Sequence, residues 1–143
     1  MSKWKTIVVG VDGSPPSRTA LTWAAAEAAD HGADLVVLTV WERTLLPPMG
    51  SGGVPRSPVP DPSQRATEDL LTVIKAELGE DPPVPVQPLV KQGNAAQVLI
   101  KQSADADLLV VGTRGRGGFR GLVLGSVSQH VAAYAKCPVT VVR

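Results

Sequence analysis

Four residues near the carboxyl end of the chain have the types and the spacing of a site for a phosphate group. Two residues separate Gly112 from Gly115, and nine more separate Gly115 from the pair Gly125–Ser126. Glycine lets backbone N–H groups approach phosphate oxygens closely, and a helix that begins near Ser126 would direct its N-terminal partial charge toward the same space. The sequence contains no Asp or Glu after Asp107, so this region suits an anion. The pattern predicts a phosphate-binding cradle built from two short segments.

Each of these residues also has an explanation that needs no ligand. Gly112 and Gly115 are what a surface turn would use. Ser126 and Gln129 have the spacing of a capping box, in which the serine hydroxyl caps its own helix. Arg114 can add a charge-assisted hydrogen bond to a phosphate, or it can simply be a solvated loop residue. The sequence leaves these alternatives open.

Two better-known phosphate-binding motifs are absent from the sequence. A Walker loop requires Gly-Lys followed by Ser or Thr, and the chain has no Gly-Lys pair. The dinucleotide fingerprint G-x-G-x-x-G should follow the first strand, where the chain has GVDGSP instead. No identifiable base, acid or lysine accompanies the glycines, which argues against a dedicated catalyst of phosphoryl transfer. We therefore expect no catalytic residues.

Short apolar runs typical of buried strands alternate with helical patterns along the chain. Strands are predicted at residues 5–11, 34–40, 83–90, 107–112 and 137–143, and helices at 14–32, 63–78, from 94 onward, and 126–135. Ser14 is the expected N-cap of the first helix and Gly32 its end, and Asn94 is the expected N-cap of the third. Pro85 and Pro88 indicate that 83–90 is an edge strand. The alternation predicts an α/β fold, a five-stranded parallel sheet with helices on both faces. Ligands of such sheets bind beyond the carboxyl ends of the strands, where the direction of winding switches.

The length and the charge of the chain limit the remaining possibilities. Its 143 residues fit one domain, which we expect to span residues 1–143. Residues 46–62 hold six prolines and three glycines, so they predict a flexible loop. This loop is either an adaptable cover or partner site beside the ligand, or a plain connector. The net charge of +1 gives no field that favours nucleic acid or membrane. Without a membrane-length apolar run or a secretory segment, a cytoplasmic location is expected.

The chain resembles the universal stress proteins, specifically their ATP-binding branch. The family pattern G-x2-G-x9-G-[S/T] is met at every fixed position, and the resemblance extends over the whole chain. IVVGVDGSPPS resembles the first strand and turn of the family, GTRGRGG its phosphate loop, and CPVTVV its terminal strand. The resemblance implies a doubly wound, Rossmann-like sheet of order 3-2-1-4-5 that binds ATP or a related adenine nucleotide such as ADP or AMP.

The resemblance also implies roles for individual residues. Asp12 is expected to contact the adenosine part, although an Asx-turn through Asp-Gly-Ser would explain it without a ligand, and it could hold Mg²⁺ through water. Val40 is expected to offer backbone groups and an apolar wall to adenine. The full set of expected nucleotide contacts is Asp12, Val40, Gly112, Arg114, Gly115, Gly125, Ser126, Val127 and Ser128.

The function implied by the resemblance is that of a nucleotide-dependent regulator in the stress response. Two alternatives stay open: a slow ATPase or adenylate-transferring enzyme of related architecture, and a nucleotide-free dimeric interaction module. An apolar terminal strand at a sheet edge invites pairing with another chain. Together with the resemblance, this predicts a homodimer through the strand at 138–143.

Overall fold

The computed structural model describes residues 4–42, 61–113 and 125–143. In chain order the elements are β1 (Thr6–Gly10), α1 (Pro15–His31), β2 (Asp34–Trp41), α2 (Pro62–Leu78), β3 (Val86–Gln92), α3 (Ala95–Ser103), β4 (Leu108–Gly112), α4 (Ser126–Tyr134) and β5 (Val139–Val142). The predicted loop at 46–62 lies outside the described residues except for Asp61 and Pro62, which begin α2.

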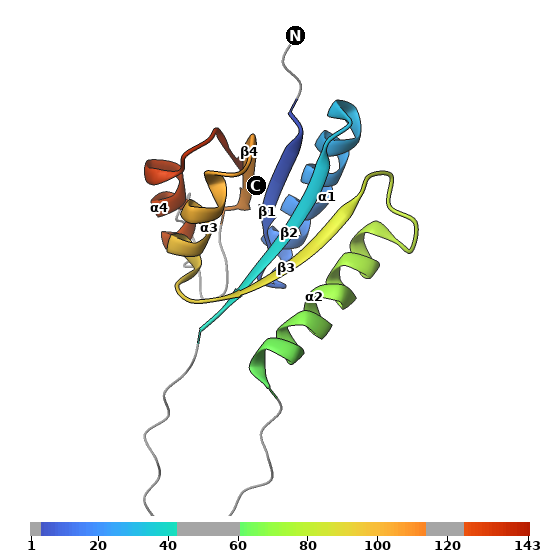
Figure 1. Ribbon diagram of the computed structural model, residues 1–143, viewed down its shortest axis with the longest axis horizontal. Helices are drawn as coiled ribbons and strands as arrows, with labels where there is room; N and C mark the ends of the chain where they lie inside the picture. Colours follow the sequence, from blue (N-terminus) through green and yellow to red (C-terminus); the bar gives the residue numbers. More distant parts are fainter. Residues whose placement is uncertain (1–3, 43–60, 114–124) are drawn as a thin grey trace, which may run out of the picture.

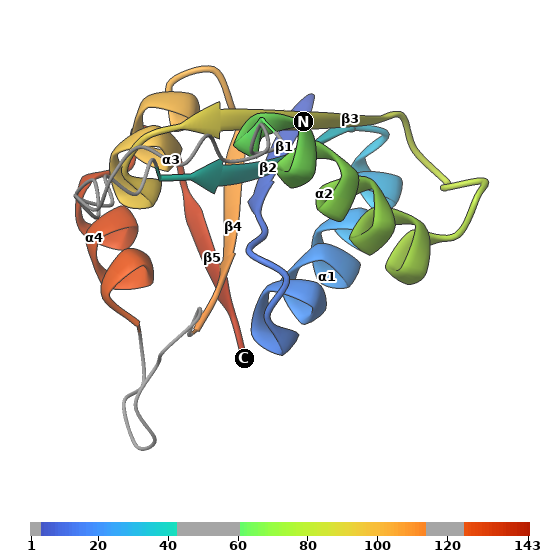
Figure 2. The ribbon, with the colours of Figure 1, turned by 90° about the horizontal axis from the view of Figure 1, so that it is seen from below.

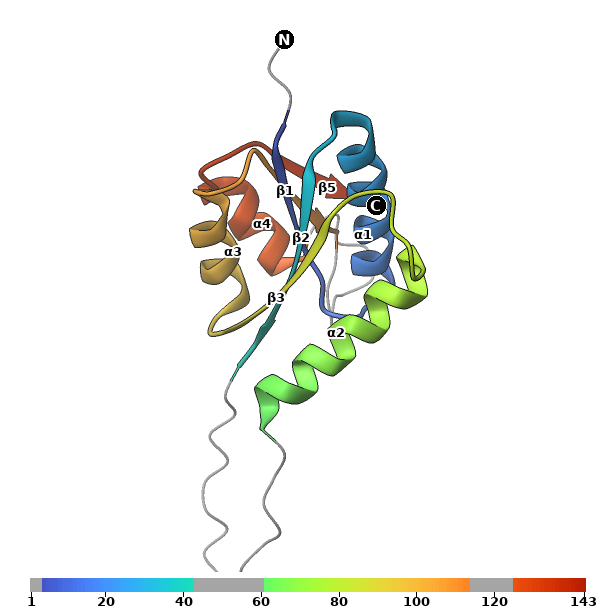
Figure 3. The ribbon, with the colours of Figure 1, turned by 45° about the vertical axis from the view of Figure 1, so that its right-hand side comes forward.

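The five strands form one parallel sheet in the order β3-β2-β1-β4-β5, as expected. Helices α1 and α2 cover one face of this sheet, and α3 and α4 cover the other (Figures 1 and 3). Figure 2 shows the same arrangement from a perpendicular direction, with the sheet between the two helix pairs. The chain winds from β1 to β3 in one direction and then crosses to β4 and β5, so the switch point lies between β1 and β4.

The strand residues are apolar without alternation because both faces of the sheet are buried. In β1, Ile7 and Val9 pack on the side of α1 and α2, whereas Val8 packs on the side of α3 and α4. All three side chains are fully buried. Burying a side chain of this size stabilises a fold by about 1.5–3 kcal/mol, so the central strand anchors two hydrophobic cores at once.

The predicted edge strand is confirmed, although its bounds move from 83–90 to Val86–Gln92. The N–H of Leu35 donates to the carbonyl of Pro85, and the N–H of Gly93 donates to the carbonyl of Trp41, both at 2.9 Å. In a parallel ladder this register turns the backbone groups of Pro88 outward, away from β2. Pro88 therefore removes no hydrogen bond from the sheet, which explains how β3 accommodates a proline.

The opposite edge of the sheet, β5, carries no proline between its ends. The N–H of Leu109 donates to the carbonyl of Pro138 at 3.0 Å, and the N–H of Thr113 donates to the carbonyl of Val142 at 3.1 Å. The same register argument turns the backbone groups of Val139 and Val141 outward. The two edges of the sheet thus differ, since only β5 offers an uninterrupted row of outward backbone groups.

The start and the end of α1 and the start of α3 follow their sequence signals. Ser14 caps α1 by accepting from the N–H of Ser17, and Gly32 ends that helix with a φ of 66°. Asn94 caps α3 by accepting from the N–H of Gln97 at 3.1 Å. No helix in the described part of the chain has the length and apolar character needed to cross a membrane.

Asp107 ties the amino-terminal ends of β1 and β4 together. Its carboxylate accepts hydrogen bonds from the N–H groups of Lys5 (2.8 Å) and Thr6 (3.0 Å), and these bonds hold the pKa of Asp107 below its ordinary value of 3.8. Protonation therefore costs the folded state more than the unfolded state. The stabilisation is complete above the ordinary pKa and is lost as the pH falls through the lowered folded-state pKa.

We expect Asp107→Asn to weaken the fold at pH 7 and to reduce the loss of stability between neutral and acidic pH. Urea unfolding of wild type and variant at pH 7 and at about pH 3 measures this difference. Asp105→Asn, an exposed carboxylate two residues away, is the control. Identical pH dependence of wild type and Asp107→Asn would contradict the assignment.

Candidate functional site

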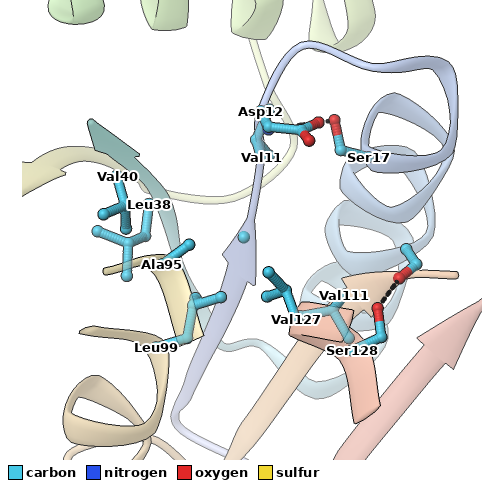
Figure 4. Close-up of a pocket in the computed structure, with 12 residues that line it drawn as sticks. Val11, Asp12, Ser17, Leu38, Val40, Ala95, Leu99, Val111, Val127 and Ser128 are labelled. Carbon is cyan, nitrogen blue, oxygen red and sulfur yellow. Dashed lines mark hydrogen bonds between the residues drawn. The ribbon is translucent and has the colours of Figure 1, made fainter. Parts of the chain in front are cut away.

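A pocket of about 100 Å³ opens at the carboxyl ends of β1, β2 and β4 (Figure 4). We call it the switch-point pocket, because it lies where the winding of the sheet reverses. Its apolar walls come from five elements or the turns beside them and include Val11, Leu38, Val40, Leu99 and Val111. Its polar lining includes Asp12, Ser17 and Ser128. An apolar pocket with a few polar groups at this place is the usual form of a ligand site in such sheets.

Most of the residues singled out in the sequence come together here. Asp12, Val40, Gly112, Val127 and Ser128 all line the switch-point pocket. Val127 is also one of the few large apolar side chains exposed on the described surface, at 36% exposure, so it offers an apolar contact to a ligand.

The two segments of the predicted cradle meet beside this pocket. The N–H of Gly125 donates to the carbonyl of Thr113, which places the start of α4 against the end of β4. Ser126 is exposed at the first position of α4. Arg114 and Gly115 lie outside the described residues.

The predicted capping box at Ser126 is wrong. The N-cap of α4 is Gly125, with φ −74° and ψ 168°, and Ser126 is the first helical residue. Within the described residues no side chain caps α4, whereas Ser14, Asp61 and Asn94 cap the three other helices. The first N–H groups of α4 are therefore left for another acceptor, and the positive end of its dipole is available to an anion. A capping box therefore does not explain the presence of Ser126.

Gly112 has a packing role that its sequence position did not reveal. A Cβ atom on Gly112 would lie 2.8 Å from both the carbonyl carbon and the carbonyl oxygen of Pro16, at the start of α1. The absent side chain lets β4 end directly against the backbone of α1. Gly112 is therefore required by close packing, and it lines the pocket as well.

Asp12 belongs to a turn that fixes its position at the pocket. Its Oδ1 accepts from the N–H of Ser14 at 3.0 Å and from the Ser14 hydroxyl, so the Asx-turn expected from the sequence is present. The buried hydroxyl of Ser17 accepts from the N–H of Asp12 at 3.2 Å and donates to the carbonyl of Ser14 at 2.9 Å. Asp12 therefore both closes the Asx-turn and lines the pocket, so the turn does not exclude a contact of Asp12 with a ligand.

Several lining residues were not predicted. The sequence offers one weak indication for Ser17, which stands three residues after the N-cap Ser14. Leu38, Ala95, Leu99 and Val111 have none, because their residue types are those of any buried core.

Comparison with known proteins gives a consistent result. A sequence profile of the universal stress protein family matches residues 3–143. A universal stress protein of Mycolicibacterium smegmatis is 40% identical over 139 residues, which cover 96% of this chain and 45% of that protein. One from Mycobacterium tuberculosis is 36% identical over 140 residues, with the same coverage. The chain thus spans less than half the length of these relatives.

Two solved structures share the fold along their whole length. A universal stress protein in complex with cAMP has a TM-score of 0.67 and 28% identity, and the match covers 99% of this chain and 98% of that one. UspA from Lactobacillus plantarum has a TM-score of 0.69 and 22% identity, with both chains fully covered. The profile match, the identity to the curated relatives and the shared fold show that the chain belongs to the universal stress protein family.

Proposed function

We propose that this chain binds an adenine nucleotide in the switch-point pocket. The observation that carries the proposal is the start of α4, the only helix of the described chain without a side-chain cap, which lies at the rim of an apolar pocket. The flat aromatic faces of adenine suit the apolar walls of the pocket, whereas phosphate groups suit uncapped N–H groups at a helix start. The related protein in complex with cAMP supports the same class of ligand.

The placement of the nucleotide follows from the positions of these groups. Leu38 and Val40 form the apolar wall that we assign to the base, and Asp12 stands beside it for the adenosine part. The phosphates would then reach Gly125 and Ser126 at the start of α4. Arg114 and Gly115 remain proposed contacts to the phosphates, supported by the family pattern alone.

We propose ATP as the ligand, with ADP or AMP as related forms. Mg²⁺ fits the site only with help from the nucleotide, because no group of three or more His, Cys, Asp or Glu side chains gathers within residues 4–42, 61–113 and 125–143. Asp12 would hold the ion through water, and phosphate oxygens and further waters would complete its octahedral shell. The ion would neutralise phosphate charge, which would stabilise the bound nucleotide.

The biological role that we propose is that of a regulator in the stress response whose state depends on the bound nucleotide. Family membership supports this role, and the glycine motif without an accompanying base or lysine supports binding over dedicated catalysis. A cytoplasmic location without nucleic-acid or membrane partners is proposed on the same membership and on the net charge of +1.

Calorimetric titration with ATP, ADP, AMP, cAMP and adenosine tests the proposal. We expect adenosine to bind and each added phosphate of the linear series to strengthen binding, because the helix start favours negative charge. Chromatography of the supernatant after denaturing the purified protein would identify any nucleotide that purifies with it. Failure of all five compounds to bind would refute the proposal, and rapid release of phosphate from ATP would favour the enzyme alternative.

We also propose that two copies of the chain pair through β5. The outward backbone groups of Val139 and Val141 form an unpaired strand edge, whereas Pro88 interrupts the corresponding row on β3. Unprotected edge strands tend to pair with another chain. A two-fold antiparallel pairing of β5 would satisfy these groups in both copies.

Val141→Pro is expected to convert such a dimer into a monomer. The N–H of Val141 points away from β4, so proline removes a hydrogen bond between copies and leaves the β4–β5 ladder intact, as Pro88 does in β3. Sedimentation equilibrium measures the change in mass. A variant that keeps its fold and remains as dimeric as the wild type would rule out pairing through β5.

A further inference from the structure

Three polar side chains are buried in the described part of the chain, and all three are serines. They are Ser17, Ser103 and Ser128, each exposed by 5% or less. A buried hydroxyl is tolerated when it is hydrogen-bonded, and each of these three is bonded to backbone groups. What distinguishes Ser128 is the place of its bond.

Ser128 is the third residue of α4, and its hydroxyl donates to the carbonyl of Gly112, 16 residues earlier at the end of β4 (Figure 4). The N–H of Gly125 donates in the same direction, to the carbonyl of Thr113. Thr113 is itself held, because its N–H donates to Val142 of β5. Two bonds from the first turn of α4 thus fasten it to two consecutive carbonyls at the end of the sheet.

The single hydroxyl hydrogen of Ser128 is used in this bond. Phosphate oxygens are hydrogen-bond acceptors at neutral pH, so a hydroxyl that already donates to Gly112 has no hydrogen left for them. Ser126 is different, because it is exposed at the first helical position. The two serines of α4 therefore differ: the exposed hydroxyl of Ser126 is accessible to a ligand, whereas the hydroxyl of Ser128 is used in its bond to the end of β4.

We infer that Ser128 is a positioning residue for the anion site. It fixes the direction in which the uncapped N–H groups at the start of α4 point, by joining α4 to Gly112 on the other side of the cradle. This inference rests on the proposed nucleotide site. It places the Ser128 hydroxyl one step away from the ligand, although the residue lines the pocket.

The test compares the affinity for ATP with the affinity for adenosine in matched variants. Ser128→Ala removes the bond to Gly112, and we expect its affinity for ATP to fall by about 10-fold, the equivalent of one hydrogen bond of about 1.4 kcal/mol. The affinity for adenosine should stay within about 2-fold, because adenosine has no phosphate to reach the helix start. Ser128→Thr keeps a hydroxyl and should recover most of the affinity for ATP.

Ser103→Ala is the control for the loss of any buried serine. The Ser103 hydroxyl is fully buried, donates to the carbonyl of Ile100 and accepts from the N–H of Lys136 at 2.8 Å, and Ser103 does not line the pocket. We expect this variant to lose stability while the ratio of the two affinities stays at the wild-type value. An equal loss of both affinities in Ser128→Ala, or no loss of either, would overturn the inference.

Hydrogen exchange separates this inference from the proposed function. In the ligand-free protein, loosening α4 from β4 should speed exchange of the Gly125 amide in Ser128→Ala, and not in Ser103→Ala. Unchanged exchange would refute the positioning role even if ATP binds. Faster exchange in a protein that binds no nucleotide would instead refute the proposed function and confine Ser128 to a structural role.

Discussion

Ser126→Glu is expected to abolish tight ATP binding and to leave the fold slightly more stable. The residue is exposed at the first position of α4, where no side chain of the described residues caps the helix. An acidic residue in a first turn stabilises a helix by about 0.3–1 kcal/mol. The same carboxylate would occupy the place of the phosphates, compete for the free N–H groups and repel the ligand. Binding and stability should therefore change in opposite directions.

The expected loss of ATP affinity is about 100-fold or more, because hydrogen bonds to a charged group contribute about 1.5–3 kcal/mol each. Calorimetry measures the affinities, and urea unfolding measures the stability. Gln64→Glu, an exposed position in the first turn of α2 and away from the pocket lining, introduces the same charge as a control. ATP binding by Ser126→Glu at wild-type strength would remove α4 from the site.

Gly112→Ala is expected to destabilise the fold by about 1–3 kcal/mol, the usual cost of overpacking a rigid interior. The added Cβ would lie 2.8 Å from the backbone of Pro16, and a helix backbone cannot move aside as a side-chain end does. Gly112 is not among the glycines with positive φ, so the cost comes from this contact alone. Denaturant unfolding without ligand measures the effect.

Gly10→Ala is the matched control, since Gly10 lines the same pocket. Its Cβ would meet the terminal methyl groups of Leu99 at 3.0 and 3.2 Å, and these belong to a side chain that can rotate. We expect a clearly smaller loss of stability than in Gly112→Ala. Equal stability losses would contradict the packing role of Gly112.

The sequence was sufficient to predict the fold because the signals for each element were local. Buried runs such as IVVG, the caps Ser14 and Asn94 and the stop at Gly32 agree with one another, and the structure confirms each of them. The bounds of β3 were misplaced by a few residues, because Pro85 and Pro88 mark an edge strand without saying where its pairing with β2 begins.

The site was predicted only in outline, since its details depend on contacts between distant residues. The motif spacing predicted Gly112, Gly125 and Ser126, of which Gly112 lines the switch-point pocket. The start of α4 is set by the extended backbone of Gly125 and its bond to Thr113, which a local capping pattern does not encode. The contact of Gly112 with Pro16 joins residues almost a hundred positions apart and leaves no local trace.

That contact also bears on how the sequences of relatives should be compared. A glycine at the position of Gly112 is demanded by the packing of α1 against β4 whether or not a nucleotide is present. A relative that had ceased to bind nucleotide would still be under selection to keep it. The residue at the position of Ser126 is not constrained by packing in this way, because Ser126 is exposed and takes no part in helix capping. Under the proposed function, the serine is therefore the more informative of the two positions for recognising relatives that bind nucleotide.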